Sequence, residues 1–65
     1  MRPELAIVGE REVDGVRILD IDTSKATYQG HAWRDMGDFG KRKFENFLFL
    51  ERMQDAIQYI KIRYV

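Results

Sequence analysis

The sequence contains no cysteine, a single histidine and a single proline among its 65 residues. Without cysteine the chain cannot form disulfides, and one histidine cannot supply the Cys/His ligands of a structural zinc site. A domain of this size buries only about 60% of the surface that its unfolded chain exposes. Small domains without such cross-links often gain burial by association. We therefore expect one domain over residues 1–65 that forms a homodimer.

The sequence also lacks an excess of charge and a long apolar run. Eleven basic residues balance eleven acidic ones, which removes the simplest electrostatic argument for a nucleic-acid-binding protein. Lys and Arg interrupt every apolar run well before the roughly 18 residues of a membrane span. The amino-terminal segment lacks the apolar core of a signal peptide. These absences predict a cytoplasmic protein.

The charges are unevenly distributed along the chain. Residues 1–22 contain three basic and six acidic residues, whereas residues 41–65 contain six basic and three acidic ones. One interpretation is that the amino-terminal sheet and the carboxy-terminal helix attract each other within the molecule. The other is that the basic end faces an acidic partner.

The clearest local signal in the first third is an Asp-Gly pair between β-forming residues. Asp14 and Gly15 suit a type I′ hairpin turn, whose two central residues need positive φ. Both faces of this hairpin carry apolar residues, so we expect the helix to cover one face and a second subunit the other. The turn fixes a register with these cross-strand pairs: Val13–Val16, Glu12–Arg17, Glu10–Leu19 and Val8–Ile21.

The middle of the chain is typical of a third strand followed by a loop. Residues 25–33 are predicted to form the strand, with Gly30 marking a bulge or a close backbone approach. Residues 34–40 contain two glycines and two aspartates without periodicity, which indicates a loop.

The last third has the periodicity of a helix. Apolar residues recur at spacings of three and four from Leu50 to Tyr64, which predicts a helix from Phe44 to about residue 61. The alternative is that residues 59–65, in which apolar and basic residues alternate, form a closing strand. We favour the helix because no Gly or Pro separates Asp55 from Ile60 to reverse the chain.

These elements predict an α+β fold, in which a three-stranded antiparallel sheet (β-β-β) is packed by one long carboxy-terminal helix. The alternative is a small all-β barrel whose last third forms two strands. A helix from Phe44 to Ile62 would be about 28 Å long, whereas typical strands reach about 17–20 Å. We expect the surplus end of the helix to form the self-association surface, through Ile57, Ile60, Ile62 and Tyr64.

No residues in the sequence form a recognised catalytic, cofactor-binding or metal-binding pattern. His31 is the only side chain suited to acid–base work near neutral pH, and we expect a surface or sheet histidine. A metal site from His31, Asp35 and Asp38 has no recognised ligand spacing. Asp20 and Asp22 are expected to be two solvent-facing carboxylates at a strand end. The sequence therefore predicts a protein that is not an enzyme and needs no cofactor.

Aromatic and basic residues alternate between the third strand and the helix. Aromatic rings and arginines dominate protein interfaces, while cations beside aromatic rings also suit phosphates and bases. Three of the cations, Lys41–Lys43, stand where a helix start would favour acids, unless the helix starts near Phe44. Trp33 and Phe39 can alternatively pack on the helix. The predicted partner-binding residues are Trp33, Arg34, Phe39, Lys41, Arg42 and Lys43.

The function that we expect is that of a small non-enzymatic interaction or regulatory protein. It would act by binding another macromolecule, as a homodimer. The second hypothesis is a nucleic-acid-binding regulator that uses Arg34 and Lys41–Lys43 to contact phosphates. The third is a subunit of a larger assembly.

Overall fold

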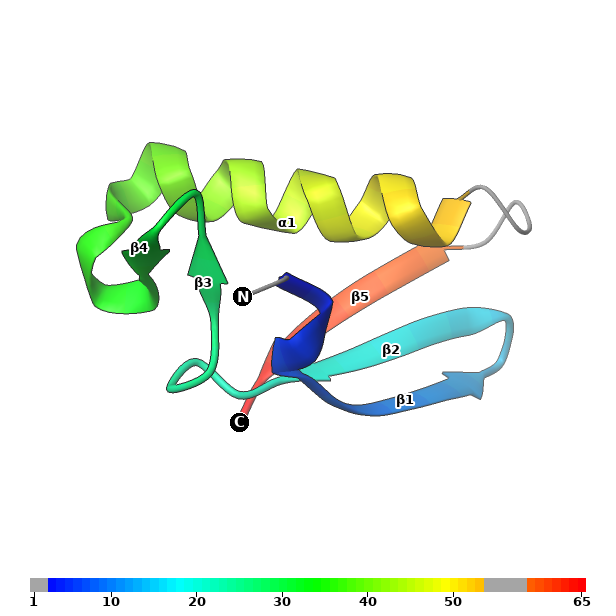
Figure 1. Cartoon of the computed structure of the whole chain (residues 1–65). Helices are drawn as coiled ribbons and strands as arrows, with labels where there is room; N and C mark the ends of the chain where they lie inside the picture. Colours follow the sequence, from blue (N-terminus) through cyan, green and yellow to red (C-terminus); the bar gives the residue numbers. More distant parts are fainter. Residues whose placement is uncertain (1–2, 54–58) are drawn as a thin grey trace.

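A computed structural model describes residues 3–53 and 59–65 of the chain. The helices and strands follow one another along the chain as shown in Figure 1. Their bounds are η1 Pro3–Ala6, β1 Ile7–Val13, β2 Val16–Ile21, β3 Thr27–Tyr28, β4 His31–Ala32, η2 Trp33–Asp35, α1 Gly37–Met53 and β5 Tyr59–Tyr64.

The predicted hairpin is confirmed. Asp14 and Gly15 have φ values of 51° and 79°, as a type I′ turn requires, and β1 and β2 pair antiparallel on either side of it. The pairs Val13–Val16, Glu12–Arg17 and Glu10–Leu19 form as expected. The register shifts between Ile7 and Gly9, so Ile7 rather than Val8 lies opposite Ile21. This irregularity is a β-bulge, which bends the edge strand β1.

The sheet is mixed rather than wholly antiparallel, which corrects the predicted fold. Its strand order is β1-β2-β5, with β2 and β5 parallel. Parallel neighbours need a long crossover, and α1 provides it by carrying the chain back across the sheet. The predicted helix to residue 61 was therefore wrong, because α1 ends at Met53 and residues 59–64 form β5. The helix lies in the middle of the chain, the closing strand is the alternative that the sequence offered, and the two-strand barrel is not formed.

The expected third strand is a small separate hairpin. Among the strands that the structure describes, β3 and β4 pair only with each other. Gln29 and Gly30 have φ values of 51° and 79° and turn the chain sharply between the two strands. Gly30 therefore marks a turn rather than a bulge. The loop predicted over residues 34–40 is also shorter than expected, since η2 covers Arg34 and α1 begins at Gly37. The basic residues Lys41–Lys43 are thus helical, and the helix does not start near Phe44.

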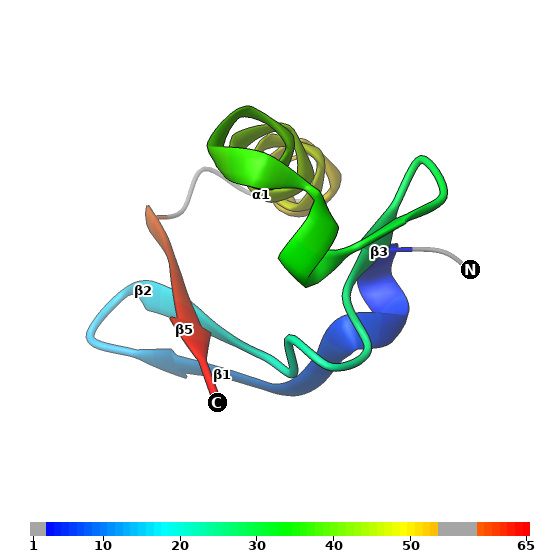
Figure 2. The ribbon, with the colours of Figure 1, turned by 90° about the vertical axis from the view of Figure 1, so that its left-hand side faces the viewer.

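The core lies between α1 and one face of the sheet, as Figure 2 shows from the end of the molecule. Phe44 and Leu48 of α1 are buried against Leu19 and Ile21 of β2. Phe44 and Leu48 thus define the side of α1 that faces the core. Leu50 lies outside that side and is 65% exposed. Within the part of the chain that the structure describes, no helix has the length and apolar character needed to cross a membrane.

Candidate functional site

One face of the three-stranded sheet is turned away from α1, and we call it the outer face. Side chains alternate along each strand, so the residues next to buried Leu19 and Ile21 point outward. The strand register then defines three rows of residues across this face: Val13–Val16–Tyr59, Arg11–Ile18–Lys61 and Gly9–Asp20–Arg63.

None of the elements within residues 3–53 and 59–65 covers the outer face, since α1 lies on the opposite side of the sheet and the β3–β4 hairpin lies beyond the end of β2 (Figures 1 and 2). The first row is apolar, although Val13 is 47% exposed and Tyr59 is 81% exposed. The second row places half-buried Ile18 between the exposed cations Arg11 and Lys61. A solvated sheet face ordinarily carries polar side chains, so the apolar first row and Ile18 between two cations make this face the candidate site.

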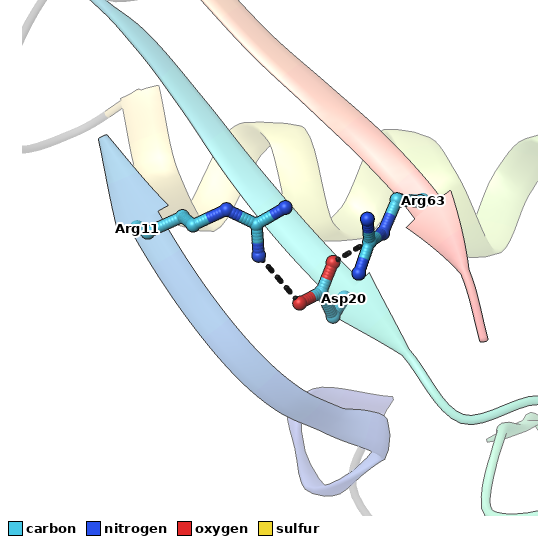
Figure 3. Close-up of polar contacts among 3 residues, drawn as sticks. All are labelled: Arg11, Asp20 and Arg63. Atoms are coloured by element: carbon cyan, nitrogen blue, oxygen red, sulfur yellow. Dashed lines mark hydrogen bonds and ion pairs between the residues drawn. The ribbon is translucent and has the colours of Figure 1, made fainter. Parts of the chain in front are cut away.

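Asp20 of the third row contacts Arg11 of the second row and Arg63 of its own row, as Figure 3 shows. Its Oδ2 atom accepts a hydrogen bond from Nη1 of Arg11 at 2.7 Å, and its Oδ1 atom accepts one from Nε of Arg63 at 3.0 Å. Asp20 is 9% exposed, so the expectation of a solvent-facing carboxylate was wrong. One carboxylate thus joins all three strands and orients two guanidinium groups, and this triad retains a net positive charge.

A second set of ion pairs joins the covered face of the sheet to the helix. Glu10 of β1 accepts from Arg17 of β2 at 2.8 Å and lies 3.1 Å from Arg52 in the last turn of α1. The expected attraction between an acidic sheet and a basic helix is present in this contact. These charges hold the end of α1 over the sheet and face inward, so they do not belong to the outer face.

The predicted partner-binding residues lie in η2 and at the start of α1, and they divide into two groups. Trp33 packs within the molecule: its ring lies 5.8 Å from that of Phe44, 4.8 Å from that of Tyr64 and 4.7 Å from Nζ of Lys41. Phe39 is 70% exposed and has Nζ of Lys43 at 4.6 Å from its ring centre. Each of these two contacts brings a ring of the predicted set next to a cation of the same set. Trp33, however, has a packing role.

Arg34 lines a shallow depression of about 430 Å³ beside η2. The other lining residues are Thr23, Ser24, Ala32 and Trp33. At its border, Asp22 accepts hydrogen bonds from the backbone N–H and the hydroxyl of Ser24, and these bonds lower the pKa of the Asp22 carboxyl. Asp22 thus caps the turn after β2, which accounts for its position without a catalytic role.

The residues expected to mediate self-association lie elsewhere than on a helix. Ile60 and Ile62 sit in β5 and pack against the core, while Ile57 lies outside the described residues. Tyr64 donates a hydrogen bond from its hydroxyl to Glu45 of α1. Burial and the neighbouring Glu45 carboxylate raise the pKa of Tyr64. The helix end on which this prediction depended does not include Ile60, Ile62 or Tyr64, because these residues form part of β5.

The groups considered for catalysis and metal binding do not converge. His31 is exposed in β4, opposite Tyr28. Among residues 3–53 and 59–65, no three His, Asp or Glu side chains are grouped so that they could hold a metal ion.

The outer-face residues Arg11, Asp20, Lys61 and Arg63 were not among the predicted site residues. The hairpin register already placed Gly9 opposite Asp20, which indicated a carboxylate over a residue without a side chain. The alternation in residues 59–65 also separated the basic residues from the isoleucines. These two patterns indicate a shared surface only when residues 59–64 form a strand beside β2.

Comparisons with known proteins return no match among protein-family models, curated proteins or solved structures.

Proposed function

We propose that this protein is a small non-enzymatic binding module that contacts another protein through the outer face of its sheet. The observation that supports this function is that the described elements cover only one side of the sheet. Its other side presents exposed Tyr59 and Val13 next to Arg11, Lys61 and Arg63. Aromatic and arginine side chains around an apolar centre are the composition of protein interfaces.

The Asp20 triad contributes preorganisation to this surface. A free arginine side chain loses rotamer freedom when it is immobilised in a complex, at a cost of about 0.5–1.5 kcal/mol. Arg11 and Arg63 are already oriented by Asp20 before any partner arrives. Each guanidinium has five donors, and a single bond to Asp20 leaves most of them for a partner.

Affinity capture from the extract of the source cells, with and without nuclease, tests the proposal. The bait is the tagged chain, and two double variants are compared with it. Tyr59→Ser with Lys61→Glu alters the outer face, whereas Phe39→Ser with Arg42→Glu makes the same changes in polarity and charge on α1. We expect the tagged chain to capture a protein whose recovery is unchanged by nuclease. That protein should be absent only when the outer-face variant is the bait. Loss only with the α1 variant would contradict the proposal.

A second candidate function is nucleic-acid binding at η2 and the start of α1. Phe39 offers an exposed ring, and four cations lie within ten residues of the chain: Arg34, Lys41, Arg42 and Lys43. Single-stranded nucleic acid binds through such stacking and phosphate contacts, and its affinity falls steeply as salt rises. A titration with duplex and single-stranded nucleic acid at several salt concentrations tests this candidate. Absence of binding at low salt would dismiss it.

Association with further copies or with a larger assembly is a third proposal. It is supported by the small size of the domain and by its uncovered sheet face. Sedimentation analysis over a range of protein concentrations distinguishes a monomer from a homodimer.

A further inference from the structure

The main-chain groups on one side of β5 are available for pairing. The amide of Val65 donates to the carbonyl of Ile21 at 2.9 Å. Because main-chain groups alternate in direction along a strand, those of Lys61 and Arg63 also point to β2, whereas those of Ile60 and Ile62 point away from it. We call this outward side of β5 the free edge. Among the described residues, β2 is the only strand that pairs with β5.

The two edges of the sheet differ in their capacity to accept a strand. β1 is bent by the bulge between Ile7 and Gly9, and such irregularities protect edge strands from pairing. β5 pairs with β2 in regular register over its whole length from Tyr59 to Tyr64 and contains no Gly or Pro. β5 is therefore the edge on which strand addition can occur.

An apolar hollow lies between β5 and the helix. Glu45, Phe49 and Met53 form one row of α1 at four-residue spacing, and Glu45 binds Tyr64 of β5 at one end of this row. At the other end, a hollow of about 210 Å³ is lined by Phe49, Met53, Tyr59 and Ile60. An apolar side chain from a strand added next to Ile60 would point toward this hollow.

The opposite side of the same edge is basic. Lys61 and Arg63 project from β5 on the outer face, and Lys61 makes no ion pair with any residue in the ranges that the structure describes. A strand added here would place every second side chain beside these cations. Opposite charges across neighbouring strands are stabilising, whereas like charges are destabilising.

We propose that the free edge of β5 binds an extended acidic segment of another protein, which adds to the sheet as a further strand. Acidic side chains of that segment would face Lys61 and Arg63, and the alternate apolar side chains would face the hollow beside Met53. This inference rests on the proposed function and names the partner's chemistry and binding mode. Strand addition of this kind takes affinity from main-chain hydrogen bonds and specificity from alternate side chains.

The charges of β5 argue against a second copy of this chain as the occupant. Antiparallel pairing of two β5 strands about Ile62 would set Lys61 of each copy opposite Arg63 of the other. A parallel arrangement would also bring cations next to cations. Both arrangements lose the electrostatic complementarity that an acidic strand provides.

The probe is a synthetic peptide of about eight residues, a common strand length, in which glutamate alternates with valine. Its binding to the full chain is measured by calorimetry, and amide exchange of Ile60 and Ile62 is followed by NMR. We expect both amides to become protected. Lys61→Glu should weaken binding by about tenfold, equivalent to about 1.4 kcal/mol. The matched variant Lys25→Glu, at an exposed position in the turn after β2, should leave the affinity within about twofold.

Two N-methylated versions of the peptide separate strand pairing from simple charge attraction. One carries N-methyl groups on the glutamates and the other on the valines, so only one version blocks the amides that face β5. We expect one version to lose binding and the other to retain it. Equal binding of the two would overturn strand addition. The proposal would also be overturned if Ile60 and Ile62 became protected only by concentration-dependent self-association, or if single-stranded nucleic acid displaced the peptide.

The peptide experiment and the capture experiment can fail separately. If a captured protein depends on Tyr59 and Lys61 but the two N-methylated peptides bind alike, the proposed function stands and strand addition fails. If no protein is captured through the outer face, the proposed function fails whatever the peptide does.

Discussion

The carboxylate of Asp20 lies directly over Gly9. A Cβ atom at Gly9 would be 2.8 Å from Oδ2 of Asp20, closer than carbon and oxygen atoms normally approach. Gly9 pairs with Asp20 across β1 and β2, next to the bulge in β1. The missing side chain at Gly9 thus leaves room for the carboxylate that orients Arg11 and Arg63 on the outer face.

Replacing Gly9 by alanine should therefore lower the free energy of unfolding by about 1–3 kcal/mol, the usual cost of adding a carbon to a filled space. Gly9 is not among the residues with positive φ, so the close contact is the expected cause. The control is the same substitution in an Asp20→Ala background, where its cost should fall below about 0.5 kcal/mol. Chemical denaturation measures all four chains, and an equal cost in both backgrounds would contradict the contact.

Phe44 and Phe39 form a matched pair on α1. Phe44 is fully buried and its ring lies near those of Tyr28 and Trp33, whereas Phe39 is 70% exposed. Phe44→Ala should destabilise the fold by about 3–5 kcal/mol, a large part of the total stability of a small domain. Phe39→Ala should change it by less than about 0.5 kcal/mol. Thermal unfolding followed by circular dichroism compares the two, and similar losses would mean that the helix is rotated.

The raised pKa of Tyr64 predicts how the stability of the fold changes with pH. Burial and then the neighbouring Glu45 raise its pKa above the usual value of 10.0. Below that value, Tyr64 is protonated in both the folded and the unfolded chain. Above pH 10.0, the unfolded chain loses the Tyr64 proton first. The contribution of protonated Tyr64 to the free energy of unfolding is therefore lost as the pH rises through the folded-state pKa.

The melting temperature of wild type should thus fall more steeply above pH 10 than that of Tyr64→Phe, which lacks this group. Tyr59→Phe is the control, because the Tyr59 side chain is 81% exposed. Identical pH profiles for wild type and Tyr64→Phe would show that Tyr64 does not hold β5 to α1 through Glu45.

Sequence reasoning was most successful where local chemistry determines the structure. Asp14 and Gly15 have the residue types that a type I′ turn demands, so the hairpin and most of its register could be predicted. It failed where a distant partner decides. The spacing of Leu50, Ile57 and Ile60 suits a helix, but the segment from Tyr59 to Tyr64 pairs with β2 instead. The open edge of β2 is a property of the folded chain and overrides local propensity.

The candidate site was only partly predictable for the same reason. Trp33 and Lys41, which both belong to the predicted set, lie close in sequence and are in contact. Arg11, Asp20 and Arg63 come from three strands and meet only because β5 lies beside β2. Lys61 and Arg63 therefore did not indicate a site in the sequence, because only the pairing of β5 with β2 brings them next to Arg11 and Asp20.

Residue-by-residue amide hydrogen exchange of the isolated chain tests the central claim most directly, namely that β5 is an edge strand with one side unoccupied. The account predicts slow exchange for Lys61 and Arg63, whose amides point to β2, and fast exchange for Ile60 and Ile62, whose amides point to the free edge. Uniform protection from Tyr59 to Tyr64 would contradict it, because a helix or an edge that is already covered would protect every amide.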